Sequence, residues 1–111
     1  MEQVDFSDWG KLELAIGEIL SAEKIARTEK LYKLKVDLGG GEVRQIVSSL
    51  VPYYTAKELV GKKVVVFANL KAAKFAGEES QGMLLCAESG DGKTCVLLGP
   101  QADVPVGTKV T

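Results

Sequence analysis

Apolar and polar residues alternate over long parts of this chain, which is the pattern of strands with one buried face. Between residues 31 and 38 the even-numbered positions are all apolar or aromatic, whereas the odd-numbered positions from Lys33 onward are charged. We therefore expect a strand over 31–38 with a basic outer face. The run Gly39–Gly41 predicts a hairpin turn because glycine tolerates positive φ, and 43–48 predicts the partner strand.

The first strand is expected to be long and to change phase. The even-numbered residues of 12–16 are apolar, but Ile19 is out of step with them. Because a glycine at a phase change often marks a β-bulge, we expect one at Gly17–Glu18. A long first strand bent in its middle is what a small closed barrel needs. Residues 22–30 are polar and are expected to be a connection.

A short helix is predicted between the third and fourth strands. Thr55 and Glu58 have the spacing of a capping box, and Gly61 supplies a stop. After its first residue, 63–68 has no polar interruption, which predicts a strand buried on both faces. Two further strands are expected, at 83–87 and 94–98.

This order of elements indicates one all-β domain over 1–111, a five-stranded OB-fold barrel with a short helix between strands three and four. Extra segments flank the barrel, namely an extended N-terminal arm at 1–10 and a C-terminal tail at 100–111. The arm carries Phe6 and Trp9. These aromatic side chains are expected to pack against the parent domain or, alternatively, against a second subunit.

Composition limits the kinds of binding and catalysis that we expect of this chain. The net charge is −1 and there is no histidine, so the chain lacks a general attraction to nucleic acid and also the commonest general base. Cys86 and Cys95 alone cannot complete a zinc site. We expect them to be buried thiols in adjacent strands, with a hairpin disulfide as the alternative in an oxidising compartment. No catalysis, metal or cofactor is expected, and without a signal peptide or an apolar span the prediction is a cytoplasmic protein.

The stretch 69–83 is long and polar although it joins two apolar strands. In an OB barrel, oligonucleotides bind on the face of strands two and three, flanked by the 1–2 and 4–5 loops, and this stretch is the 4–5 loop. We expect basic side chains to meet phosphates there and polar ones to bond backbone or bases. The basic residues are Lys30, Lys33, Lys35, Arg44, Lys71 and Lys74, and the polar ones are Asn69, Ser80 and Gln81. A merely solvated strand face is the alternative.

Aromatic residues are scarce near this groove. Tyr32 is expected to face the core, and Phe75 is the only aromatic residue on the loop. Proteins that bind single-stranded nucleic acid depend on base stacking against aromatic side chains. The sequence therefore favours recognition of a folded RNA by shape and phosphate contacts.

Several short motifs occur in order along the chain. They are 5–11 before strand one, Lys30-Leu31-Tyr32, 44–48, 53–55, 58–63, Asn69-Leu70-Lys71 and, most specific, Glu79-Ser80-Gln81-Gly82-Met83. With these motifs the chain resembles a family of OB-fold tRNA-binding domains. That family includes the C-terminal appendix of methionyl-tRNA synthetases, free-standing tRNA-binding proteins, a related secretion chaperone and endothelial-monocyte-activating polypeptide II. The resemblance covers nearly all of 4–111.

The resemblance implies a non-catalytic module that binds the tRNA body by its structure and forms a homodimer, in which Phe6 and Trp9 take part. It also implies tRNA contacts at Asn69, Ser80 and Met83, although a core position is the alternative for Met83. Strand one departs from the family pattern, because Ala15 and Glu18 stand where basic residues are usual. Modest tRNA affinity is therefore expected.

Two hypotheses of function follow. In the first, the chain raises the tRNA affinity of methionyl-tRNA synthetase, either in trans or as its detached domain. In the second, it is a dimeric export-related chaperone that binds unfolded polypeptides. The Glu-Ser-Gln-Gly-Met motif favours the first hypothesis, and a generic single-strand binder is a third, weaker alternative.

Overall fold

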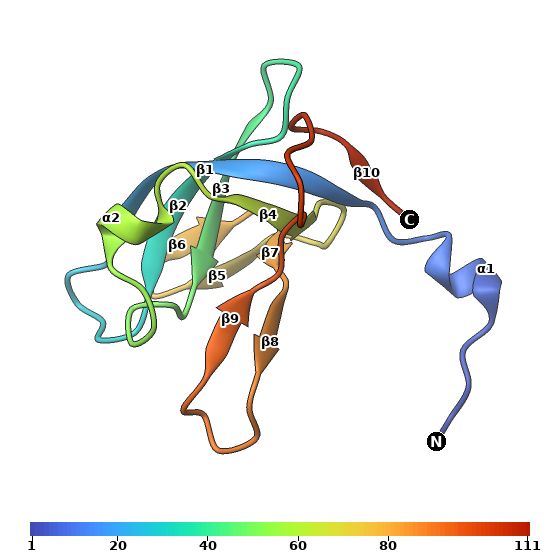
Figure 1. Cartoon of the computed structure of the whole chain (residues 1–111). Coiled ribbons are helices and arrows are strands. Elements are labelled where there is room, and N and C mark those ends of the chain that lie inside the picture. The colour runs from blue at the N-terminus through green and yellow to red at the C-terminus, as the bar shows by residue number, and fades with distance from the viewer.

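The computed structural model describes all residues from 1 to 111, and its centre is a nearly closed antiparallel barrel (Figure 1). The barrel strands are β1 (Leu14–Lys24), β2 (Tyr32–Asp37), β3 (Val43–Ser48), β4 (Lys63–Phe67) and β7 (Met83–Leu84). They are arranged in the order β3-β2-β1-β4-β7. Helix α2 (Ala56–Leu59) lies between β3 and β4 in the chain. The predicted five-stranded OB-fold barrel with its short helix is confirmed.

The even-numbered side chains of β2 point into the barrel interior, as their alternation predicts. Tyr32, Leu34 and Val36 are buried, and they belong to a cluster of 12 buried residues that also includes Ile46 and Val66. The one polar atom of this β2 face, the Tyr32 hydroxyl, donates a hydrogen bond to a backbone carbonyl oxygen. A buried hydroxyl without such a partner would be destabilising, so Tyr32 fits the core and does not face the groove.

Strand β1 serves both halves of the barrel wall, pairing with β4 through its first part and with β2 through its second. Leu14 and Ile16 belong to a second, smaller cluster, against which residues of the C-terminal tail pack. Gly17 points into the barrel, where an added Cβ would lie 2.7 Å from Val36 Cγ1. The phase change in the sequence therefore marks the point at which the buried face of β1 changes from one side of the strand to the other.

The bulge predicted at Gly17–Glu18 is wrong. Pairing with β4 continues in register through both residues, and the irregularity falls between Ile19 and Ser21 in the pairing with β2. Glycine is needed at position 17 for close packing, so its presence misled the prediction. Strand β1 also continues to Lys24, which takes in the first residues of the stretch expected to be a connection.

The predicted turn and helix cap are confirmed. All three glycines of Gly39–Gly41 have positive φ. The Thr55 hydroxyl accepts from the Glu58 backbone N–H at 3.2 Å, and the Glu58 carboxylate accepts from the Thr55 N–H at 2.8 Å. Hydrogen bonds that Thr55 makes to the carboxylate, the one from its backbone N–H above all, hold the pKa of Glu58 below its usual value.

The chain after β4 is more ordered than predicted. Instead of one loop, residues 69–83 contain an antiparallel ribbon of β5 (Ala73–Phe75) and β6 (Glu78–Ser80). The strand predicted at 83–87 is divided, because β7 pairs with β4 whereas β8 (Cys86–Glu88) pairs with β9 (Cys95–Leu97). The β8–β9 hairpin projects from the end of the barrel (Figure 1).

The two ends of the chain lie outside the barrel. The arm, expected to be extended, contains the short helix α1 (Phe6–Trp9), which stands away from the barrel in Figure 1. Phe6 is 84% exposed and Trp9 41% exposed. The expected packing of these aromatic side chains against the parent domain is therefore wrong.

At the other end of the chain, β10 (Lys109–Val110) pairs with β1. Neither helix of the structure is long enough to cross a membrane.

Candidate nucleic-acid interface

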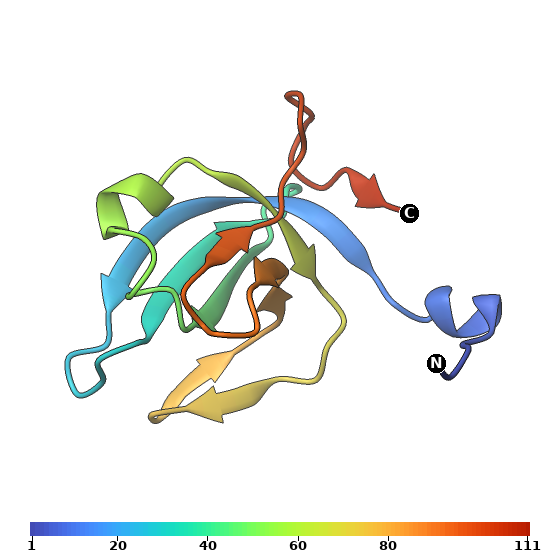
Figure 2. The ribbon, with the colours of Figure 1, turned by 60° about the horizontal axis from the view of Figure 1, so that its bottom comes forward.

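The β5–β6 ribbon lies beside the barrel wall, and its turn is held by a residue distant in sequence (Figure 2). Ala76 and Gly77 form the turn with φ of +52° and +80°, a mirror-image turn that matches the twist of a two-stranded ribbon. Arg27, from the β1–β2 connection, donates to the Ala76 carbonyl oxygen. The φ of +80° at position 77 favours glycine, and an added Cβ there would also lie 2.9 Å from the Arg27 guanidinium.

A seam of hydrogen bonds joins β6 and the residues after it to the free edge of β3. Ser80 is 3% exposed, and its Oγ accepts from the Val47 backbone N–H at 3.0 Å while donating to the Gly82 carbonyl at 2.9 Å. The Gln81 side chain accepts from the Gln45 backbone N–H at 3.0 Å, and the Gln45 side chain donates to a β6 carbonyl. The ribbon is thereby fixed at the edge of the strand-two and strand-three face.

Arg44 strengthens the seam from within. Its guanidinium donates to the carbonyl oxygens of Ala68 and Gln81 and forms an ion pair with Glu42 at 2.6 Å. The same side chain therefore holds the end of β4, the end of β6 and its own strand. Because a carboxylate already balances this charge, Arg44 has less to offer a phosphate than its sequence position suggests.

Asn69 ties the start of the ribbon segment to the chain before β1. Its side-chain oxygen accepts from the Glu13 backbone N–H, and its side-chain nitrogen donates to the Lys11 carbonyl, both at 2.7 Å. The side-chain amide of Asn69 thus bonds through both its oxygen and its nitrogen to backbone groups that lie 56 and 58 residues earlier in the chain. This position favours an amide because it must donate and accept at once.

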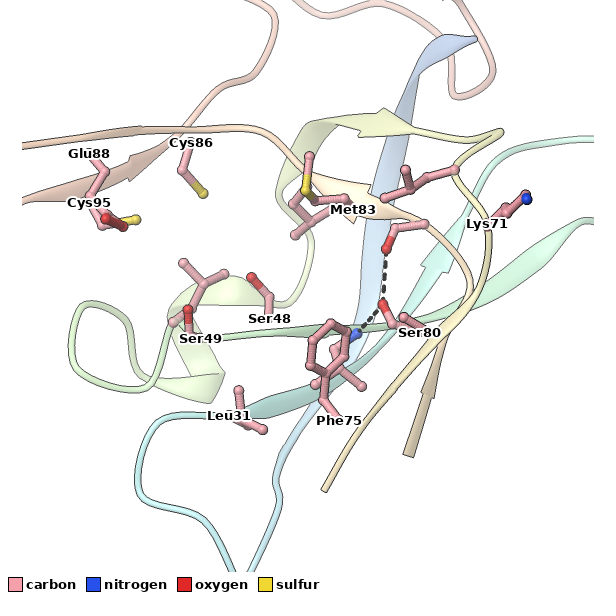
Figure 3. Close-up of a pocket in the computed structure, with 16 residues that line it drawn as sticks. Leu31, Ser48, Ser49, Lys71, Phe75, Ser80, Met83, Cys86, Glu88 and Cys95 are labelled. Atoms are coloured by element: carbon pink, nitrogen blue, oxygen red, sulfur yellow. Dashed lines mark hydrogen bonds between the residues drawn. The ribbon is translucent and has the colours of Figure 1, made fainter. Parts of the chain in front are cut away.

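A cavity of about 410 Å³ opens between the ribbon, the end of β3 and the segment from β7 to β9 (Figure 3). Its walls are mostly apolar, and Phe75 and Met83 lie on opposite sides of it in the view of Figure 3. These two side chains are 47% and 43% exposed. Such a mostly apolar hollow with a few polar groups is typical of a small-molecule binding site.

The basic side chains around the ribbon fall into two groups. Lys33 lies 3.7 Å from the Glu78 carboxylate, and Arg44 is paired with Glu42. The other expected lysines have no carboxylate within 4.0 Å; they are Lys30, Lys35, Lys71 and Lys74. Lys71 lines the cavity, whereas Lys74 alternates with the cavity-lining Ala73 and Phe75 and so lies on the other face of the ribbon.

A family model described as "Putative tRNA binding domain" matches residues 14–109, from the start of β1 into β10. The chain belongs to this family of tRNA-binding domains. Among curated relatives, methionine–tRNA ligases from Methanococcus maripaludis and Archaeoglobus fulgidus are 50% and 52% identical over 99% and 98% of this chain. The chain spans only 16% of the length of these relatives.

Solved structures agree with this assignment of the tRNA-binding domain. A MetRS-related protein from Pyrococcus horikoshii is 45% identical, with a TM-score of 0.92 over 100% of both chains. The CsaA chaperone from Bacillus anthracis is 26% identical, with a TM-score of 0.88 over 99% of this chain and 100% of the chaperone. The expected family is therefore confirmed, and the chaperone branch is more distant in sequence.

The structure brings most of the predicted site residues of this tRNA-binding domain to the ribbon. Several of them, however, form hydrogen bonds that hold the fold. Asn69, Ser80 and Gln81 hold backbone groups, and only Ser80 of the three lines the cavity. Met83 begins β7 with an exposed side chain at the cavity, so it is not a core residue as the alternative held. The six basic residues do not meet in one hollow; Lys71 alone among them lines the cavity.

Sequence reasoning missed part of the cavity wall. Ser48, Ser49 and Glu88 contribute polar groups, and Cys86 and Cys95 contribute thiols from adjacent strands. Burial, helped by contact with Cys95, raises the pKa of the Cys86 thiol to about 12, so this thiol is uncharged at neutral pH. The apolar runs that contain Cys86 and Cys95 indicated burial, but nothing in the sequence placed them beside the ribbon.

Proposed function

We propose that this tRNA-binding domain is a non-catalytic module that binds folded tRNA at the ribbon and raises the tRNA affinity of methionyl-tRNA synthetase. One observation carries the proposal: the ribbon is fixed to the barrel at its start, turn and end, yet it keeps unpaired lysines and an open cavity. The fixed points are Asn69, Arg27 at the turn and the seam at Ser80. A rigid surface suits a folded RNA because little conformational entropy is lost on binding.

Phosphate contacts supply most of the affinity in this proposal. Lys30, Lys35, Lys71 and Lys74 have no carboxylate partner, so the charge of each is available to a phosphate; the Lys35 ammonium also donates to the Gln45 side chain at 2.9 Å. The overall charge of −1 gives no background attraction to other RNAs. If about four phosphates are engaged, log K falls with log salt at a slope of roughly −3 to −4.

The partnership with methionyl-tRNA synthetase is supported by the relatives. Proteins named methionine–tRNA ligase carry a segment about half identical to this chain, and a protein of matching length is named as MetRS-related. A tRNA-binding segment linked to a catalytic unit raises the local tRNA concentration at that unit. We place this activity in the cytoplasm with the other components of aminoacylation.

The arm is proposed to form a homodimer. Val4, Phe6, Trp9 and Leu12 are exposed apolar residues that surround a hollow of about 620 Å³ on the arm. Exposed apolar patches of this kind mark contact surfaces. Light scattering at micromolar concentration tests the proposal: a dimer mass is expected, and a Phe6→Asp variant should be monomeric with an unchanged barrel fold.

A chaperone function is the second candidate, favoured by the likeness to CsaA structures and by the exposed arm. It predicts that the chain suppresses aggregation of an unfolded model protein at equimolar concentration. Our first proposal predicts no suppression, and this assay separates the two.

Gel shift with total tRNA and with an unstructured RNA of the same length and charge tests the main proposal. Tighter binding of tRNA is expected at every salt concentration, since both RNAs carry the same phosphates and only one has the folded body. Equal affinity for the two RNAs would contradict structure-specific binding. Addition of the chain to a methionyl-tRNA synthetase core should then lower the KM for tRNA without changing kcat.

A further inference from the structure

Three polar side chains of the cavity take no part in holding the fold. The hydroxyls of Ser48 and Ser49 and the carboxylate of Glu88 line the cavity, and no protein group within the chain pairs with the Glu88 carboxylate. In Figure 3 these residues lie on one side of the cavity, and Lys71 lies on the opposite side. The walls between the two sides are apolar and include Phe75 and Met83.

We propose that this cavity binds a single unpaired guanine of the RNA, with its ring between Phe75 and Met83 and its pairing edge at Glu88. The inference rests on the proposed function in that the base belongs to a bound tRNA. A base stacked on the Phe75 ring gains the contact that single-stranded bases make with aromatic side chains. The Met83 thioether is polarisable and covers the other face of the ring.

The volume and the arrangement of charge both suit a nucleobase. The cavity of about 410 Å³ lies in the range of roughly 300–1,000 Å³ found for small-molecule sites. A base entering between Phe75 and Met83 would direct its pairing edge to Glu88 and leave its phosphate on the Lys71 side. Glu88 and Lys71, an anionic and a cationic group on opposite sides of the cavity, have the charges that a donor edge and a phosphate would meet.

Guanine follows from the donor pattern that a carboxylate requires. An ionised carboxylate only accepts hydrogen bonds, and its two oxygens accept two parallel ones. Guanine carries an N1–H and an N2 amino group side by side on its pairing edge, whereas adenine and cytosine present one amino group and uracil one imino N–H. The Ser48 and Ser49 hydroxyls can donate to the neighbouring O6. Unpaired bases of RNA are read on this edge by proteins.

The chain contains only two methionines, Met1 and Met83, which provides a direct probe of the cavity. In protein labelled with ¹³C at the methionine methyl groups, GMP should shift the Met83 signal by its ring current and leave the Met1 signal unchanged. IMP lacks the N2 amino group and should bind about tenfold more weakly, as the loss of one of two paired hydrogen bonds predicts. AMP, CMP and UMP should bind more weakly than GMP.

Variants separate base reading from phosphate binding. Glu88→Gln should abolish the preference for GMP over IMP, while the control Glu79→Gln, an exposed carboxylate of β6 that does not line the cavity, should retain it. Phe75→Ala should reduce tRNA affinity about tenfold without changing the salt slope, because stacking releases no counterions. The control Val96→Ala, exposed on β9 and absent from the cavity wall, should leave tRNA affinity unchanged.

Each outcome decides one of the two proposals. If tRNA binds but neither tRNA nor millimolar GMP moves the Met83 signal, the cavity inference is wrong and the tRNA-binding proposal stands. If all mononucleotides bind equally, or Glu88→Gln keeps the preference, guanine reading is overturned. If an unfolded polypeptide moves the Met83 signal and nucleotides do not, the cavity serves the chaperone activity. If GMP binds as expected and tRNA does not, the tRNA-binding proposal fails.

Discussion

The side-chain oxygen of Ser80 lies 3.0 Å from the backbone nitrogen of Val47 and accepts its hydrogen bond. This single contact replaces the ladder bond that a neighbouring strand would supply at the free edge of β3. It lets β6 lie beside β3 without regular strand pairing, so β6 remains free to pair with β5 in the ribbon. The placement of the candidate interface therefore depends on a buried hydroxyl.

Ser80→Ala should destabilise the chain by about 1–3 kcal/mol, because the buried Val47 N–H loses its acceptor. The ribbon should then detach at the seam, and tRNA affinity should fall although no charge has changed. Chemical denaturation and a tRNA titration measure the two effects. Ser21→Ala, at an exposed position of β1, is the matched control and should be close to neutral. Unchanged stability in Ser80→Ala would mean that the seam is not held by this hydroxyl.

Ala76→Asn should stabilise the chain by about 1 kcal/mol. Ala76 has a φ of +52°, a region that costs an ordinary L-residue roughly 1–2 kcal/mol and that asparagine tolerates better. Thermal unfolding measures the gain, and Ala72→Asn, an exposed residue without positive φ, should show none. A loss of stability would indicate that the alanine methyl group makes a contact of its own.

The capping box should make stability depend on pH in the acid range. The pKa of Glu58 is lowered in the folded state by the hydrogen bonds from Thr55, so its contribution is present above the unfolded value and is lost as pH falls through the folded value. The difference in unfolding free energy between the wild type and Glu58→Gln should therefore shrink from pH 6 to pH 3. A difference independent of pH would contradict a charged cap.

Cys86 should react slowly with alkylating reagents in the native state. Its pKa is raised to about 12 by burial and by the Cys95 neighbour, and only the thiolate is nucleophilic. At pH 8 the native rate should be at least about 100-fold below that of an unfolded chain, in which the pKa of cysteine is roughly 8.5. Fast native reaction would show that the thiol is neither buried nor protonated.

Much of the barrel could be predicted from residues 31–68 because burial there follows simple periods. The alternation in β2, the glycine turn and the Thr55–Glu58 cap are local signals, and each is confirmed. The bulge was misplaced because a glycine can be required by close packing alone, without any change of backbone shape. At Gly17, Val36 fills the space of a side chain.

The candidate site was less predictable because its geometry comes from distant contacts. Strands of three residues, such as β5 and β6, have too few positions for a period to appear. Arg44 was expected to face phosphates, yet it bonds carbonyl oxygens 24 and 37 residues away. Cavity residues such as Glu88 depend on how the β8–β9 hairpin leaves the barrel, which no local pattern records.

The most direct test of the proposed site is the salt dependence of tRNA binding by the Lys71→Ala/Lys74→Ala variant. Fluorescence anisotropy with labelled tRNA, at salt concentrations from 50 to 200 mM, gives the slope of log K against log salt for each protein. If both lysines neutralise phosphates, the slope should become less steep by about two units, and affinity should fall. The control Lys57→Ala/Lys93→Ala removes two exposed lysines outside the ribbon and should keep the wild-type slope. An unchanged slope in the ribbon variant, or an equal change in the control, would contradict the proposed interface.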